Sequence, residues 1–163
     1  MSYKYENIGG KVNSYAFETD NGLVYEVKFK PTPYLFGDNL PEISNFIFEL
    51  IIEVVYNPEN KFPSVDKKIG ETTAAIFIDF YKKYGQAVSI YVCDSSDGKQ
   101  LIRQRKFSQW FYEFTDSNFF KIDEKLIDSN NQIYPITLIL SKSNPLRNEI
   151  FEAFINISEI HSK

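Results

Sequence analysis

The sequence predicts an α+β fold with a mixed, mostly antiparallel sheet, in a single domain of 163 residues. Hydrophobic residues make up 43% of the chain and aromatic residues 17%, enough to build a core without disulfides or metals. Stretches that alternate apolar and polar residues, as strands do, are interleaved with stretches of helical spacing. No internal repeat or linker divides the chain, so one domain over residues 1–163 is expected.

The first strands are expected near the start of the chain. Residues 15–17 and 23–29 alternate apolar and polar side chains, and Asp20-Asn21-Gly22 between them tolerates the positive φ of a tight hairpin turn. After a loop rich in proline, residues 46–56 form a long strand. One face of this strand is wholly apolar and the other mixes isoleucine with glutamate, so we expect it in the middle of the sheet.

Two helices and a strand follow. Ser64 or Asp66 is placed to cap the first helix, in which apolar residues recur at helical spacing until Gly85 ends it. Residues 87–93 form a short strand rich in β-formers. A polar turn then leads into a second helix, whose aromatic residues share one face as far as Phe114.

The end of the chain predicts a second hairpin and a third helix. Residues 119–127 and 133–140 alternate on either side of a polar turn. Asn144 then provides a cap residue before Pro145, which suits the first turn of a helix. The resulting order is β-β-β-α-β-α-β-β-α, which favours one sheet covered by helices mainly on one face.

Charge and cysteine content narrow the function classes. The formal net charge of -4 argues against a general binder of nucleic acid, so a nucleic-acid partner is not favoured. The single cysteine, Cys93, forms no internal disulfide, and the first residues lack a signal-peptide profile, so we expect a cytoplasmic protein. The longest apolar stretch, residues 46–56, is too short for a membrane-spanning helix, so no membrane partner is expected.

One segment holds the candidate ligand site. It joins the strand over residues 87–93 to a polar turn and a basic helix that we expect to begin near Asp97. Three basic residues of this helix then share one face near its N-terminus, where free amides attract anions such as phosphate. The candidate ligand-binding residues are Asp94, Asp97, Lys99, Arg103 and Lys106.

The same segment has a structural interpretation, which we favour. Asp97 caps the helix, with Ser96 as an alternative cap, and Gln100 completes a capping box with Asp97. Asp94 pairs with an arginine of the helix. The turn matches neither a calcium loop nor a glycine-rich nucleotide motif, so no cofactor is expected.

Cysteine and metal chemistry find little support in the chain. Cys93 is expected beside a helix N-terminus, which lowers a thiol pKa, but its only histidine partner would be His161 near the end of the sequence. A buried structural thiol is therefore favoured over a nucleophile. Because cysteine and histidine are so scarce, we expect no zinc site.

One enzyme class stays open. The leading order β-β-β-α-β-α is that of the ribonuclease H fold, in which carboxylates bind two metal ions that drive phosphodiester cleavage. Asp94 and Glu71 stand where such a site could use them. The first strand offers Glu18 at its end instead of a mid-strand aspartate, however, and the extra hairpin breaks the order. A metal-dependent nuclease is kept as an alternative.

The polar turn and the second helix resemble the signature of a family of small uncharacterised proteins found chiefly in the Bacteroidota. The residues that carry the likeness are 93–100 (CDSSDGKQ), Arg103, Arg105, Lys106-Phe107, Trp110-Phe111, Asp20-Asn21-Gly22, Tyr25-Glu26-Val27 and Asn144-Pro145. The resemblance implies a bacterial protein with a domain of unknown function. It implies no activity, cofactor or catalytic residue.

The leading hypothesis is a non-enzymatic domain that binds another protein or a second copy of itself, in one version within a defence or toxin-neutralising module. Its motives are the negative charge, the absence of a complete catalytic set, and an aromatic content typical of protein interfaces. The alternatives are a phosphate- or nucleic-acid-binding protein that uses Lys99, Arg103 and Lys106, and the metal-dependent nuclease.

Overall fold

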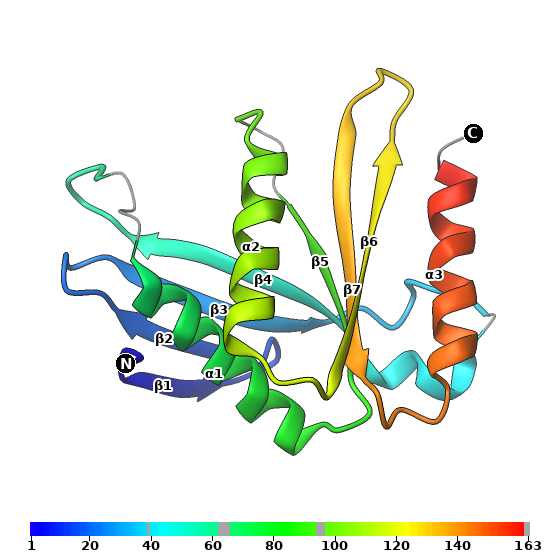
Figure 1. Cartoon of the computed structure of the whole chain (residues 1–163), viewed down its shortest axis with the longest axis horizontal. Coiled ribbons are helices and arrows are strands. Elements are labelled where there is room, and N and C mark those ends of the chain that lie inside the picture. The colour runs from blue at the N-terminus through cyan, green and yellow to red at the C-terminus, as the bar shows by residue number, and fades with distance from the viewer. Residues whose placement is uncertain (39, 62–65, 94–96, 162–163) are drawn as a thin grey trace.

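The structure, a computed structural model, describes residues 1–38, 40–61, 66–93 and 97–161 (Figure 1). The elements in chain order are β1 (Tyr5–Gly9), β2 (Ser14–Glu18), β3 (Val24–Pro31), the 3-10 helix η1 (Pro41–Phe46), β4 (Ile47–Tyr56), α1 (Lys67–Lys83), β5 (Val88–Val92), α2 (Gln100–Phe114), β6 (Phe119–Ile127), β7 (Ile133–Ser141) and α3 (Arg147–His161). The α+β class is confirmed. The order of elements matches the predicted one with an additional strand, β1, at its start.

The strands form one mixed sheet of seven in the order β1-β2-β3-β4-β5-β7-β6. Every neighbouring pair is antiparallel except β4 with β5, which run parallel. A parallel pair needs a crossover between its strands, and α1 supplies it. β4 stands in the middle of the sheet, as its one apolar and one mixed face predicted.

The sheet has a core on each face. The α1/α2 face takes its name from the two helices that cover it, and Phe77 of α1 and Phe107 of α2 belong to its larger core. The α3 face carries a smaller core, in which Ile150 and Phe154 of α3 pack with the segment around η1. Figure 1 shows α1 and α2 in front of the sheet and α3 at the right, next to β6 and β7.

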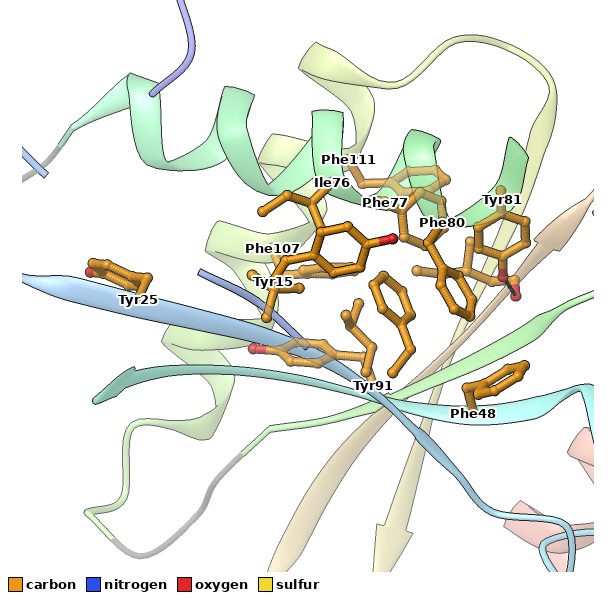
Figure 2. Close-up of a cluster of buried hydrophobic side chains, with 14 of the residues drawn as sticks. Tyr15, Tyr25, Phe48, Ile76, Phe77, Phe80, Tyr81, Tyr91, Phe107 and Phe111 are labelled. Atoms are coloured by element: carbon orange, nitrogen blue, oxygen red, sulfur yellow. Dashed lines mark hydrogen bonds between the residues drawn. The ribbon is translucent and has the colours of Figure 1, made fainter. Parts of the chain in front are cut away.

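Aromatic rings dominate the larger core (Figure 2). The ring of Phe29 on β3 stacks on Phe80 of α1, with centroids 3.8 Å apart. Next to them the Tyr81 hydroxyl lies 2.9 Å from Ser89 Oγ on β5 and donates to the Ile139 carbonyl of β7 at 3.0 Å. These buried polar contacts tie α1 to two strands of the sheet.

Two helices begin at the predicted caps. Asp66 accepts a hydrogen bond from the Lys68 amide at 2.9 Å at the start of α1, and Asn144 accepts one from the Leu146 amide at 3.0 Å ahead of α3. α1 ends at Lys83, slightly before the expected stop. In the part of the chain that the structure describes, no helix is long and apolar enough to cross a membrane.

α1 and α2 approach closely at one glycine. A Cβ atom added to Gly70 of α1 would lie 2.7 Å from Cγ of Trp110 on α2, which is closer than real side chains allow. Because Gly70 has no side chain, the Trp110 indole packs directly against the backbone of α1, and α1 and α2 are in close contact at this point.

Candidate functional site

The parallel pairing of β4 with β5 ends soon after both strands begin. Three registered pairs join them: Ile47↔Val88, Phe48↔Ser89 and Glu49↔Ile90. β4 goes on to Tyr56, and no further ladder pair joins it to β5 within the described ranges. Figure 1 shows the strands diverging, β4 toward the left and β5 upward, with α2 in front of the opening.

The second half of β4 directs backbone groups into this opening. The Thr32 amide donates to the Ile47 carbonyl at 2.9 Å, so the backbone groups of Ile47 point at β3. Backbone direction alternates along a strand, and the register between β3 and β4 is regular as far as Val54. The N–H and C=O groups of Ile52 and Val54 therefore point toward β5, beyond the last pair of the ladder.

A cleft of about 470 Å³ occupies the opening. Its walls are residues 49–54 of β4, Tyr91 and Val92 of β5, and Arg103 of α2. This volume lies in the range of protein ligand sites, and the carboxyl ends of diverging parallel strands are a place where such sites occur.

Two glutamates line the cleft on the α3 face of β4, and we call Glu49 and Glu53 the acidic rim. They stand opposite lysine and glutamate side chains of β3, with Lys30 registered to Glu49 and Glu26 to Glu53. Lys28 Nζ lies 2.6 Å from Glu53 Oε1 and 3.7 Å from Glu26 Oε1. One ammonium group thus serves two carboxylates beside the cleft.

At the start of α2, Asp97 holds Arg103. Its two carboxylate oxygens each accept a hydrogen bond of 2.6 Å from the Arg103 guanidinium, and Oδ1 also accepts the Lys99 amide at 3.0 Å. The hydrogen bonds from Arg103 and Lys99 hold the pKa of Asp97 well below its usual range. Asp97 is therefore a carboxylate at neutral pH that orients Arg103 at the edge of the cleft.

The helix begins later than predicted, and its capping box does not form. α2 starts at Gln100 with Lys99 as the cap residue and no side-chain cap. The Gln100 side chain is buried and donates from Nε2 to the Ile133 carbonyl of β7 at 3.1 Å. This hydrogen bond directs the Gln100 side chain toward the sheet. Asp97, the other residue of the predicted capping box, accepts hydrogen bonds from the Arg103 guanidinium instead.

The predicted ligand residues are brought together only in part. Asp97, Lys99 and Arg103 are in contact, while the Lys106 ammonium lies over the ring of Trp110, 5.2 Å from its centroid. Asp94 lies outside the described residues. Arg103 and Lys106 each have a protein partner, Asp97 and the Trp110 ring, and so they are not directed together at one anion as expected.

Cys93 is buried at the end of β5, with 2% of its surface exposed. Burial raises the pKa of its thiol to about 11. A thiol with this pKa stays protonated at neutral pH and is a poor nucleophile, as the sequence interpretation expected. Burial likewise raises the pKa of Tyr91, whose ring packs on Phe107 with centroids 4.4 Å apart.

Glu71, one of the residues offered for a two-metal site, has an ion-pair partner of its own. The Glu71 carboxylate lies 2.5 Å from the amino group of Met1, on the α1 side of the molecule. Within the described parts of the chain, no three His, Cys, Asp or Glu side chains gather as metal ligands would. Asp94, the other member of the predicted set, is outside those parts.

The cleft was not predicted from the sequence, and of the residues that line it Arg103 alone was among the predicted site residues. The mixed face of the central strand, with glutamates at positions 49 and 53, was the signal. The strand pairing that opens the cleft joins residues about forty positions apart, so no local pattern contains it.

A family model described as "Family of unknown function (DUF6169)" matches residues 65–156. The match runs from the start of α1 into α3 and includes the β5 and α2 walls of the cleft, while β4 precedes it. No curated protein and no solved structure matches the chain.

Proposed function

Because the chain belongs to DUF6169, a family of unknown function, we propose its role from the site itself: a protein-binding domain that takes up an extended segment of a partner protein along β4. One observation carries the proposal, namely that the pairing of β4 with β5 ends at Glu49. An unpaired strand edge is a template for another chain, and several kinds of domain bind peptides by adding them as a strand.

The other edges of the sheet differ from this one in a way that supports the proposal. The outer strand β6 carries four charged residues among nine, and the outer strand β1 is short, with a register shift between Asn7 and Gly9. Charges, shortness and irregularity are the devices that protect edges from pairing. Residues 51–56 of β4 contain a single charge, Glu53, and their register with β3 shifts only beyond Val54, so residues 51–54 lack such protection.

The surface around the open end of β4 is also suited to a protein partner. Val55 and Tyr56 expose about half of their side chains, 47% and 56%, and Val92 on the opposite wall exposes 37%. Apolar and aromatic side chains that a partner buries supply much of the binding energy of protein interfaces. Backbone pairing would then give affinity, and the walls of the cleft would give selectivity.

Phosphate or nucleic-acid binding at the start of α2 is less well supported. An anion there would have to displace the Asp97 carboxylate from Arg103, where it makes two hydrogen bonds of 2.6 Å. It would also meet the overall negative charge of the chain. If inorganic phosphate or an oligonucleotide bound at low salt and Arg103→Ala abolished that binding, this alternative would replace ours.

The test is peptide binding to variants of Ile52. Peptides selected from a displayed random library on the intact chain are titrated against Ile52→Pro, which removes the amide that faces the cleft, and Ile52→Val, which keeps both the amide and an apolar side chain. We expect Ile52→Pro to weaken binding at least tenfold and Ile52→Val to change it little, with circular dichroism reporting that both variants are folded.

A second readout keeps the test decisive if Ile52→Pro does not fold. In the unmodified chain, a bound peptide should slow hydrogen exchange at the Ile52 and Val54 amides and leave the Ile51 amide, which faces β3, as slow as before. Selection that yields no binder, or binders that protect other amides only, would refute the proposal. A dimer of the chain that Ile52→Pro dissociates would assign the edge to a second copy instead.

A further inference from the structure

The cleft offers different chemistry on its two sides. Side chains alternate along a strand, so the acidic rim lies on the α3 face together with Ile51, between Glu49 and Glu53. Ile52 and Val54 lie on the α1/α2 face, where they pack against the larger core. A strand added to β4 would therefore present every second side chain to the acidic rim and the others to an apolar wall.

The charge balance beside the rim is negative. Glu26, Glu49 and Glu53 contribute three carboxylates on this face, and Lys28 and Lys30 contribute two ammonium groups, which leaves a net charge of about -1 from these five residues. The Lys28 ammonium is already shared between Glu53 at 2.6 Å and Glu26 at 3.7 Å. A further cation on the partner would complete this set.

The other side of the cleft, on the α1/α2 face, differs because the charge that lines it, Arg103, is balanced by Asp97, with which its guanidinium pairs. Tyr91 on this side is uncharged at neutral pH. Leu50, Ile52 and Val54 supply apolar surface on this side. Apolar side chains of a partner are the ones that gain from burial against it.

We propose, resting on the function proposed above, that the partner segment is a strand with lysine or arginine on the side that faces Glu53 and apolar residues on the other side. Glu49 is already registered with Ile90 of β5, so Glu53 is the rim carboxylate that a partner residue can face directly, and Glu49 adds negative charge at the inner end of the added strand. Opposite charges on directly facing strand positions attract, and like charges repel, which gives the site its selectivity.

The probes are three acetylated and amidated peptides that differ only at their ends: Lys-Val-Thr-Val-Lys, Gln-Val-Thr-Val-Gln and Glu-Val-Thr-Val-Glu. Each reads the same in both directions, so the comparison does not depend on strand orientation. They are titrated against the intact chain by NMR at low and high salt, with Ile52 and Val54 as reporters.

We expect the lysine probe to bind roughly threefold to tenfold more tightly than the glutamine probe at low salt, and the glutamate probe to bind most weakly. High salt should shrink these ratios, since the charges are partly exposed. The double variant Glu49→Gln/Glu53→Gln should abolish the preference. A matched double variant on β1 and β2, Glu6→Gln/Glu18→Gln, should keep it.

The outcomes separate the two proposals. Equal binding of the three probes at the Ile52 and Val54 amides would refute the preference for a basic partner and leave strand addition standing. A preference for lysine that survives Glu49→Gln/Glu53→Gln would also refute it. If no probe shifts these amides at millimolar concentration and selected peptides do not either, strand addition itself is wrong.

Discussion

The two halves of β4 are similar in composition and different in environment. Residues 47–50 are mostly buried, with 2% of Leu50 exposed, whereas exposure reaches 56% at Tyr56. Both halves are mostly apolar, each with a single glutamate, so apolar character alone does not decide burial. The difference arises because the pairing with β5 ends at Glu49 while β4 continues to Tyr56, so within the described residues only the first half of β4 has a strand on both sides.

Truncating an apolar side chain in each half should separate the halves most clearly. Leu50→Ala leaves a cavity in the larger core and should lower the free energy of unfolding by about 3 kcal/mol. Tyr56→Ala removes an exposed ring and should cost less than about 1 kcal/mol. Urea denaturation measures both values. Equal losses would show that the second half is as well packed as the first.

The packing of α2, the helix that flanks the opening, should depend on Gly70 of α1. Gly70→Ala places a Cβ atom against the Trp110 indole and should destabilise the fold by about 1–3 kcal/mol, because the ring must move. Gly85→Ala is the control, since its Cβ would meet only the Tyr81 carbonyl at an ordinary 3.8 Å. If the two variants unfold at the same denaturant concentration, α2 is not held by this contact.

The stability of the fold where β4 and β5 are paired should depend on the buried Tyr81 hydroxyl. Tyr81→Phe removes the buried hydrogen bonds of the Tyr81 hydroxyl with the Ser89 hydroxyl and the Ile139 carbonyl and should cost about 1–2 kcal/mol of unfolding free energy. Tyr34→Phe, at a ring that is 71% exposed, should change it little. Thermal and chemical unfolding would show whether the loss at Tyr81 exceeds that at Tyr34.

Alkaline pH should weaken the end of β5 where it leaves β4. Burial raises the Cys93 pKa from 9.0 to about 11, so its contribution to stability is complete below pH 9 and is lost as pH rises toward 11. The unfolding free energy should therefore fall by about 1 kcal/mol more between pH 8 and pH 10 in the unchanged protein than in Cys93→Ala. Identical pH profiles would mean that the thiol is accessible to water in the folded state.

Local patterns in the sequence predicted most of the fold. The hairpins, the central strand and the caps Asp66 and Asn144 depend on residues a few positions apart, so alternation and cap chemistry reveal them. β1 was missed because three of its five residues are exposed, and its pairing with β2 leaves no strong alternation. The late start of α2 was missed because Asp97 binds a side chain six positions ahead in place of helix amides.

The candidate site could be predicted only in part. Arg103 was named from the charge pattern of its helix, and it does line the cleft. The acidic rim was visible as a mixed face, but its place beside an opening depends on where the parallel pairing with β5 stops. That stopping point depends on how two strands about forty positions apart in the sequence meet, which no short segment encodes.

The central claim is that the backbone of β4 beyond Glu49 faces an opening on one side. Hydrogen exchange of the unbound protein, followed residue by residue by NMR, tests it most directly. The Ile52 and Val54 amides should exchange orders of magnitude faster than the Ile51 and Glu53 amides, which face β3. Equal protection along residues 51–54 would contradict the account, because it would mean that this edge is already paired.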